Sequence, residues 1–267
     1  MQKGHLNMQN NDQNPSVQRF EFTTDQGAGS RARIGLLVLE SDQTIEAEFR
    51  QLTNLPNVEI YHARLANDTL VTPETLAKME VELPTAAGLL PQYLKLNSLG
   101  YGCTSGATII GEARVAQILA AIHPGVASTN PLTAAKAALS QMGVQRLGLL
   151  TPYAPDVTEA MRAQFEAAGI RVTQIGSFYE DSDIVVGRID RKSILDATVA
   201  LGRSEACDGV FISCTSLRTA DIIEEAEQIL GKPVTASNHA LAWHTLRLAG
   251  IKDQQDGFGR LFKLGMR

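Results

Sequence analysis

The chain has 267 residues, of which 44% are hydrophobic and 20% are charged, and its formal net charge is −5. This balance predicts a soluble globular protein with one large or two modest domains, and no run of eighteen apolar residues is present that could span a membrane. The negative charge and the scattered basic residues argue against nucleic acid as a partner.

The first thirty residues are rich in Asn and Gln and contain no apolar segment typical of a signal peptide. We expect residues 1–30 to form a flexible tail, because they have too few apolar side chains to pack. The chain has three cysteines. Without a secretion signal we expect them to be free thiols in the reducing cytoplasm.

Short apolar runs alternate with helical patterns from residue 31 onward. The segment IGLLVL at 34–39 predicts a buried strand, and TIEAEFRQLTNL at 44–55 predicts the helix that follows it. A second helix is expected over 72–83, with Thr72 as its N-cap and Pro73 at its first position.

The later part of the chain shows the same alternation. We expect a helix that ends at Gly169, strands at 170–178 and 208–213, a helix that stops at Gly231 and a last helix over 240–250. Strands that are apolar throughout and separated by helices are typical of parallel sheets covered on both faces. The fold class that we predict is therefore α/β.

Two segments of the chain recur at nearly the same spacing. RIGLL begins at Arg33 and RLGLL at Arg146, and a Cys-Thr-Ser tripeptide begins at Cys103 and again at Cys214. The repeat predicts two halves, each with a Rossmann-like, doubly wound parallel sheet. We assign residues 31–128 and 237–267 to the first half and residues 129–236 to the second, with the last helix packed back on the first half.

Each Cys-Thr-Ser motif comes after an apolar strand and, we expect, directly before a helix. Ligands of doubly wound sheets bind at the carboxyl ends of the strands. A thiol at a helix N-terminus can have its pKa lowered from about 8.5 to roughly 3.5–7.5, which makes it a nucleophile or a base. If the halves face each other, a small acid fits between the two thiols, held by the neighbouring hydroxyl and N–H groups.

Other sites find less support in the sequence. A lone cysteine is most often a small buried hydrophobe, and Cys207, which has no partner in the repeat, fits that role. The glycines at 100, 102 and 106 form a weak nucleotide-binding pattern, because they lie in the middle of the chain and no acidic residue ends the next apolar run. The histidines lack metal-ligand spacing, so we expect no metal site.

These residues resemble the aspartate/glutamate racemase superfamily, in particular its branch of maleate cis-trans isomerases, arylmalonate decarboxylases and ectoine-utilisation protein A. The resemblance covers roughly residues 31–251. It rests on the two Cys-Thr-Ser motifs, on GLLTPY ending at Tyr153 and on ASNHALAWHTLRLAGI at 236–251. It implies a cofactor-independent enzyme for a small carboxylic acid, with its active site in the cleft between pseudo-symmetric halves and a homodimer or higher homo-oligomer as its assembly.

The resemblance also implies roles for individual residues. Cys103 resembles the nucleophile or base of the first half, and Cys214 resembles its partner in the second. Tyr153 resembles a substrate-binding tyrosine. The positions that resemble carboxylate-holding residues are Thr104, Ser105, Thr215 and Ser216.

The presence of both cysteines bears on the reaction. Decarboxylases of this branch have a glycine in place of the first cysteine, and glutamate racemases carry Cys-Asn-Thr and Cys-Thr-His motifs. Two thiols favour isomerase or racemase chemistry, in which one thiolate attacks a double bond or takes an α-proton and the other thiol supplies a proton. Two alternatives remain: a decarboxylase-like lyase with Cys103 as a bystander, and a catalytically silent small-molecule-binding module.

The substrate depends on Asp42. Maleate isomerases place Ser-Asn-Thr after the first strand, where the Asn helps to hold a substrate carboxylate, and here the segment reads ESDQTIE. A carboxylate at position 42 disfavours a dianion such as maleate and suits an ammonium or amide N–H group. The DQTIEAEF pattern is more similar to ectoine-utilisation protein A, whose relatives act in (hydroxy)ectoine breakdown. Maleate and an amino-bearing acid of that breakdown both remain candidates, and Asp42 is equally suited to capping the helix that begins near Thr44.

Overall fold

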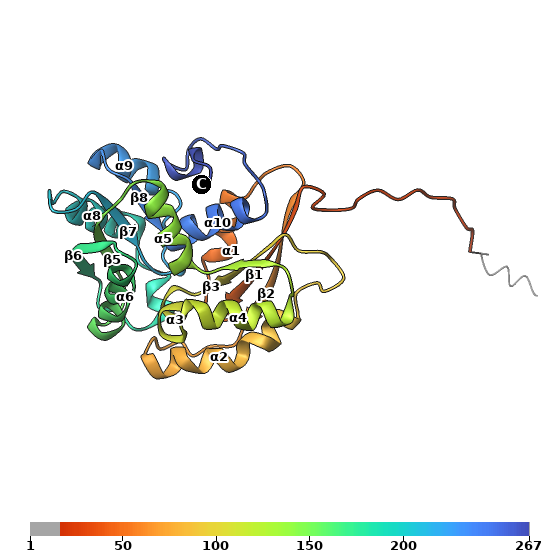
Figure 1. The fold of residues 1–267 in the computed structure, drawn as a ribbon, viewed down its shortest axis with the longest axis horizontal. Coiled ribbons are helices and arrows are strands. Elements are labelled where there is room, and N and C mark those ends of the chain that lie inside the picture. The colour runs from red at the N-terminus through yellow and green to blue at the C-terminus, as the bar shows by residue number, and fades with distance from the viewer. Residues whose placement is uncertain (1–16, 267) are drawn as a thin grey trace, which may run out of the picture.

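Four parallel strands form the first sheet, in the order β2-β1-β3-β4 (Figure 1). They are β1 (Ala32–Leu39), β2 (Val58–Leu65), β3 (Ser98–Gly102) and β4 (Ala127–Thr129). The central strands β1 and β3 are buried along almost their whole length, as strands covered on both faces must be. The computed structural model describes residues 17–266. Residues 1–16 of the expected flexible tail lie outside the described residues.

The second sheet repeats this topology in the order β6-β5-β7-β8. Its strands are β5 (Arg146–Thr151), β6 (Arg171–Ser177), β7 (Gly209–Ile212) and β8 (Val234–Ala236). The repeated RIGLL and RLGLL segments lie in β1 and β5, and the two Cys-Thr-Ser motifs follow β3 and β7. The predicted pair of pseudo-symmetric, doubly wound halves is thus confirmed.

Helices cover both faces of the first sheet. They are α1 (Ile45–Leu52), α2 (Pro73–Gly88), α3 (Thr104–Ile110) and α4 (Glu112–Ile122). The helices α2 and α4 lie on one face and α1 lies on the other, beside α10 (Ser237–Leu248) (Figure 1). The predicted N-cap of α2 is confirmed, since the Thr72 hydroxyl accepts a hydrogen bond from the N–H of Thr75.

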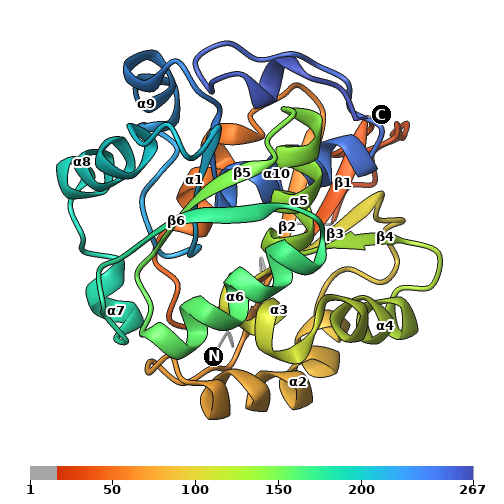
Figure 2. The ribbon, with the colours of Figure 1, turned by 60° about the vertical axis from the view of Figure 1, so that its left-hand side comes forward.

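The second sheet is covered in the same way. Its chain segment contains α5 (Pro131–Gln141), α6 (Pro155–Ala167), α7 (Asp183–Val186), α8 (Arg191–Gly202) and α9 (Ile223–Leu230). The helices α8 and α9 pack on one face and α6 on the other (Figure 2). Gly169 and Gly231, the predicted stops of α6 and α9, have φ angles of 81° and 67°, which glycine adopts at little cost.

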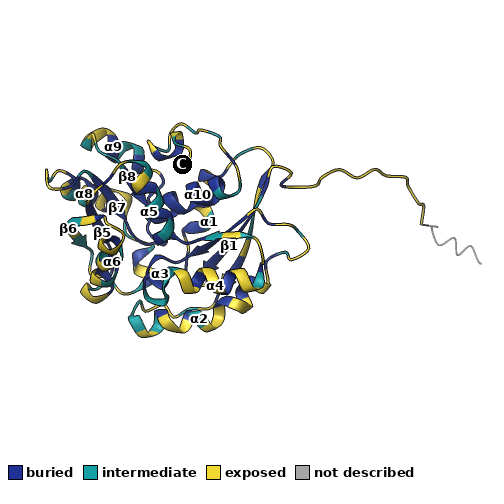
Figure 3. Ribbon diagram, viewed as in Figure 1, coloured by how far each residue is buried: buried dark blue, intermediate teal, exposed yellow. Residues whose placement is uncertain are grey.

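The helix after the last strand of each sheet packs against the other sheet. The helix α5, which follows β4, contacts β8, and α10, which follows β8, contacts β1, β3 and β4. These two helices also pack against each other, and α10 is buried from Ser237 to Arg247 (Figure 3). The halves are therefore interlocked, and their junction is part of the core. None of the helices within residues 17–266 is long and apolar enough to cross a membrane.

Candidate active site

Cys103 lies at the end of β3 and is the N-cap of α3. Its Sγ accepts a hydrogen bond from the N–H of Gly106 at 3.2 Å and lies 3.6 Å from the hydroxyl of Ser105. A Cβ atom at position 106 would lie only 2.9 Å from this sulfur. Glycine at this position therefore lets the thiol reach the backbone of the first helical turn.

Cys214 lies two residues beyond the end of β7, in a backbone conformation with φ 108°, which a residue other than glycine rarely adopts. The expectation that a helix follows it directly was wrong, because residues 213–222 contain neither a helix nor a strand and α9 begins only at Ile223. The N–H of Cys214 donates to the hydroxyl of Ser237 at 3.0 Å. A side chain of α10 thus accepts the N–H of Cys214, where no helix follows the residue.

Ser237, at the start of α10, joins the two motifs. Its Oγ lies 2.7 Å from Oγ1 of Thr104 and accepts the N–H of Cys214. The hydroxyl of Thr215 donates to the carbonyl of Gly102 at 3.4 Å. Residues after β3 and after β7 are therefore held together directly. The sequence analysis missed Ser237, although it lies in the C-terminal segment that supports the family resemblance.

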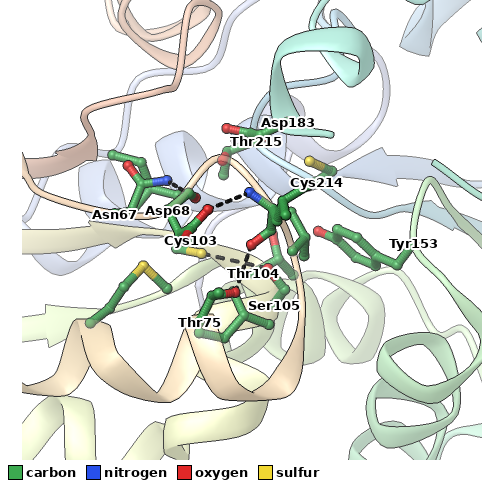
Figure 4. A pocket seen from close by; sticks show the side chains of 15 residues that line it. Asn67, Asp68, Thr75, Cys103, Thr104, Ser105, Tyr153, Asp183, Cys214 and Thr215 are labelled. Atoms are coloured by element: carbon green, nitrogen blue, oxygen red, sulfur yellow. Dashed lines mark hydrogen bonds between the residues drawn. The ribbon is translucent and has the colours of Figure 1, made fainter. Parts of the chain in front are cut away.

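One pocket contains both thiols (Figure 4). Six of the eight predicted site residues line it, namely Cys103, Thr104, Ser105, Tyr153, Cys214 and Thr215. Asp42 and Ser216 are buried nearby but do not line the pocket. The pocket is narrow, because water-sized molecules have only about 20 Å³ of space in it, room for about one water.

Asp42 performs the capping that was one of its two expected roles. Its Oδ1 accepts the N–H groups of Thr44 and Ile45 at 2.7 and 2.9 Å, at the start of α1. Its Oδ2 is buried and has no hydrogen-bond partner within residues 17–266. Burial raises the pKa of Asp42, and the two N–H donors only partly offset this effect.

Asp183 is a pocket residue that the sequence analysis missed. It is the first residue of α7, and its carboxylate accepts hydrogen bonds from Ser216 Oγ at 2.6 Å and from Ser41 Oγ. The segment around it pairs with a loop of the first half through two backbone hydrogen bonds. The N–H of Asp183 donates to the carbonyl of Thr69 at 3.0 Å, and the N–H of Val71 donates to the carbonyl of Asp181 at 2.9 Å. This pairing brings together two segments that both line the pocket. The acidic composition of residues 180–183 was the only signal in the sequence.

The predicted lowering of the thiol pKa values was wrong for these two buried thiols. Burial raises the pKa of Cys103 to about 11, although the N–H of Gly106 and the hydroxyl of Ser105 act in the opposite direction. Burial and the negative charge of Asp183 raise the pKa of Cys214 further above its ordinary value. Desolvation disfavours a thiolate more strongly than these donors favour it. Both thiols therefore hold their protons near neutral pH in this structure.

Each thiol has a tyrosine beside it. The side chain of Tyr153 lowers the pKa of Cys214, and that of Tyr101 lowers the pKa of Cys103, in both cases against the larger effect of burial. Tyr153 also accepts a hydrogen bond from Ser213 Oγ at 3.5 Å. Burial raises the pKa of both tyrosines, so their hydroxyl groups stay protonated and can donate to a sulfur or a bound ligand. Only Tyr153 was expected from the sequence.

Glu48 on α1 binds the loop that follows Cys214. Its carboxylate accepts the N–H groups of Thr219 and Ala220, the hydroxyl of Thr219 and the side-chain amide of Asn238. Burial raises its pKa to about 7 even though all four groups favour the charged form. A first-half carboxylate thus supplies the acceptor that these two N–H groups need.

The remaining reactive side chains are occupied elsewhere. Cys207 is buried, and its sulfur donates to the carbonyl of Ser204 at 3.4 Å, in keeping with a packing role. His239 and His244 on α10 are hydrogen-bonded in place, and burial lowers the pKa of each to about 4. Across residues 17–266, no three His, Cys, Asp or Glu side chains converge as metal ligands do.

Known proteins share this architecture and sequence pattern. The sequence profile of the arylmalonate decarboxylase family matches residues 112–262. The chain belongs to this family. The arylmalonate decarboxylase of Bordetella bronchiseptica is 34% identical over 140 residues, which is 52% of this chain and 58% of that enzyme. The maleate isomerase of Nocardia farcinica is 27% identical over 244 residues, or 86% of this chain and 95% of that enzyme.

A solved structure extends the comparison. It is a cysteine-to-serine mutant of the Nocardia farcinica maleate cis-trans isomerase with a covalently bound succinylcysteine intermediate. It superimposes with a TM-score of 0.79 at 25% identity, over 87% of this chain and 98% of that one. The resemblance stated from the motifs is confirmed, and the chain is placed among the enzymes of the maleate isomerase and arylmalonate decarboxylase branch.

Proposed function

We propose that the chain is a cofactor-independent isomerase or racemase in which Cys103 and Cys214 act together on a small carboxylic acid. The observation that carries this proposal is the position of the two thiols. They follow equivalent strands of two pseudo-symmetric sheets and line one pocket. A substrate between them meets one sulfur from each half, which is the arrangement that proton transfer on two sides of a carbon atom requires.

Racemisation would use both thiols as acid and base. One cysteine, as the thiolate, takes the α-proton, so the C–H bond breaks, an S–H bond forms and the electron pair passes into the substrate carboxyl group. The other cysteine, as the thiol, gives its proton to the opposite side of the same carbon. The net result is inversion, with the charge moved from one sulfur to the other.

Cis-trans isomerisation would use one thiolate as a nucleophile. The thiolate adds to one carbon of the double bond, so a C–S bond forms and the electron pair moves to the neighbouring carbon and its carboxyl group. Rotation about the resulting single bond and departure of the thiolate give the trans product. The succinylcysteine of the Nocardia farcinica enzyme supports this form of the mechanism.

Hydroxyl groups in the pocket would hold the substrate. Ser105, Thr215 and Tyr153 line the pocket and can donate hydrogen bonds to a carboxylate. The Thr104 hydroxyl is bonded to Ser237, so its role is to fix the relative positions of the motifs. Ser216 and Asp42 would act through their contacts with Asp183 and α1. Maleate and an amino-bearing acid of (hydroxy)ectoine breakdown are the two proposed substrates.

A decarboxylase-like lyase is the second candidate function. The family match and the 34% identity to the Bordetella bronchiseptica enzyme favour it. In that reaction a carboxyl group leaves as CO2 and one thiol protonates the carbon. Cys103 would then be dispensable, so activity that survives in Cys103→Ala would identify this reaction.

Deuterium exchange tests the proposal. The chain is incubated in deuterated buffer with maleate, with aspartate and with ectoine-derived diamino acids, and NMR follows deuterium incorporation and isomer formation. We expect exchange and isomer formation with the wild-type chain, and we expect isomer formation to be lost in Cys103→Ser and in Cys214→Ser. No reaction with any of these compounds, with both thiols reduced, would favour a small-molecule-binding module and contradict the proposal.

A further inference from the structure

The pocket that contains the two thiols carries negative charge that no basic residue balances. Two of its fifteen lining residues are acidic, Asp68 and Asp183, and none of the fifteen is Lys, Arg or His (Figure 4). Asp183 is only 6% exposed, whereas Asp68 is exposed to solvent. Solvent screens an exposed charge strongly, so a bound ligand interacts mainly with the charge of Asp183.

Both halves hold Asp183 in place. Ser41 of the first half and Ser216 of the second each donate a hydroxyl hydrogen bond to one of its carboxylate oxygens. A carboxylate oxygen accepts more than one hydrogen bond, so each oxygen can still accept a donor from the pocket. Asp183 is thus a fixed acceptor in the pocket wall.

A second buried carboxylate, Asp42, lies beside the pocket, and the nearby Thr215 hydroxyl lowers its pKa against the larger effect of burial. Asp42 is 2% exposed, and its Oδ2 has no hydrogen-bond partner in the described part of the chain. The charge of Asp183 raises the pKa of Asp42, and the charge of Asp42 raises the pKa of Cys214, so the three groups share one electrostatic environment. Buried oxygens without donors are costly, and a cation in the pocket reduces that cost.

We propose that Asp183 binds a cationic nitrogen of the substrate, so that the pocket selects a small carboxylic acid carrying an ammonium group over a dicarboxylate. This inference rests on the proposed function, because it names the substrate class of the same pocket. A dicarboxylate would place a second negative group near Asp183 with no basic residue of the pocket to balance it. An ammonium group forms a buried, hydrogen-bonded ion pair at the same place.

This ion pair also favours the reactive form of the thiols. The negative charge of Asp183 raises the pKa of Cys103 and of Cys214. A cation bound to Asp183 offsets that charge, and a thiolate then forms more readily. The correct substrate would therefore promote its own reaction, and a dicarboxylate would not.

Two probes of similar length test the inference. 4-Aminobutyrate and succinate differ in that one has an ammonium group where the other has a second carboxylate. Isothermal titration calorimetry measures the affinity of both probes for the wild-type chain and for Asp183→Asn. We expect the wild type to prefer 4-aminobutyrate and Asp183→Asn to reduce that preference by about 30-fold or more, as loss of one partner of a buried charge pair does.

Two variants serve as controls. Asp181→Asn removes the same charge from an exposed position of the same segment and is expected to keep the preference. Ser41→Ala removes a hydrogen bond to Asp183 but leaves its charge, so the preference should again remain. A purely structural role of Asp183 would weaken the binding of both probes equally in Asp183→Asn, and that result would overturn the inference. A wild-type preference for succinate would overturn it as well.

Thiol alkylation provides a readout that needs no ligand. Iodoacetamide should modify Cys214 faster in Asp183→Asn than in Asp181→Asn, because only the first change removes a charge that disfavours the thiolate. Equal rates would contradict the inference. Neither the affinities nor the alkylation rates depend on turnover, so they can succeed or fail independently of the deuterium-exchange experiment.

Discussion

The two Cys-Thr-Ser motifs occupy equivalent positions in the two sheets but are held in different ways. Cys103 caps α3, and the hydrogen bonds that fix it lie within the next few residues. The loop after Cys214 has no helix, and its backbone groups bond to side chains of α1 and α10. The thiol of Cys103 is therefore positioned by local hydrogen bonds, whereas the loop after Cys214 depends on side chains of α1 and α10.

The two thiols also differ in the pKa values that their surroundings give them. Burial raises the pKa of both thiols, the charge of Asp183 adds to this effect at each of them, and the charge of Asp42 adds to it at Cys214. Cys103 therefore loses its proton more readily. A two-fold repeat of sequence has thus produced two sites of unequal acidity, which suits a reaction that needs one base and one acid.

The largest expected effect is on inversion of a chiral amino acid. Cys103→Ser and Cys214→Ser should each reduce the rate of inversion by roughly 10³-fold, because one proton transfer is lost. Each variant should still exchange the α-proton of one enantiomer, as measured by NMR in deuterated buffer. The enantiomer exchanged by Cys103→Ser should be the opposite of the one exchanged by Cys214→Ser. Cys207→Ser is the control and should invert normally. Exchange of the same enantiomer by both variants would show that the thiols do not act on opposite sides.

The next largest effect concerns the support of the Cys214 loop. Glu48→Ala should lower the free energy of unfolding by about 4 kcal/mol, because it leaves buried N–H groups of Thr219 and Ala220 without an acceptor. Glu46→Ala on the same helix removes only an ion pair with Arg64 in which both partners are more than one-third exposed, and should cost less than about 1 kcal/mol. Urea unfolding measures both. Similar small losses would show that the loop does not depend on Glu48.

The same carboxylate should make stability depend on pH. The pKa of Glu48 is about 7 in the folded state, while its ordinary value is 4.5. The folded state therefore binds this proton more tightly than the unfolded state. The resulting contribution to the free energy of unfolding is complete below pH 4.5 and is lost as the pH rises to 7. The loss is about 3 kcal/mol. Unfolding free energies at pH 4.5 and 7 should differ less in Glu48→Ala than in the wild type. An unchanged difference would assign the pH dependence to other groups.

The smallest effect comes from the backbone of the two motifs. At Cys214, where φ is 108°, the glycine variant should have a free energy of unfolding about 1 kcal/mol higher than the alanine variant. At Cys103, where φ is −147°, the N-cap preference for glycine and its greater loss of conformational entropy oppose each other, so the same pair should differ by less than about 0.5 kcal/mol. Thermal unfolding of the four variants measures both differences. An equal difference at the two positions would mean that the Cys214 backbone carries no strain.

The fold was predictable because its signals are local. Apolar runs and helix caps such as Thr72 depend on residues a few positions apart, and the recurrence of RIGLL and Cys-Thr-Ser showed the two halves. The repeat also found both thiols, and the family resemblance found Tyr153. Neither found Asp183, because that residue reaches the pocket through contacts with Ser41, 142 positions away in the sequence.

The errors about the second motif have the same origin. A helix after Cys214 was a reasonable expectation from the residues that follow, but Glu48, 171 positions from Thr219, binds the N–H groups of Thr219 and Ala220, which such a helix would need for its own hydrogen bonds. The thiol pKa values were predicted in the wrong direction because burial, which raises them, is a property of the assembled pocket and not of the tripeptide. Contacts between the halves are thus what single-sequence patterns miss.

The position of Ser237 has a consequence for the order in which the molecule is made. Ser237 and Asn238 hold both motifs, yet they follow both in the chain. On the ribosome, each sheet can begin to form as its strands emerge, because N-terminal units fold first during synthesis. The loop of Cys214 cannot take its final form until α10 has emerged as well. A nascent chain therefore carries both thiols for some time before it has a pocket, and its reactivity should begin only when the last helix docks.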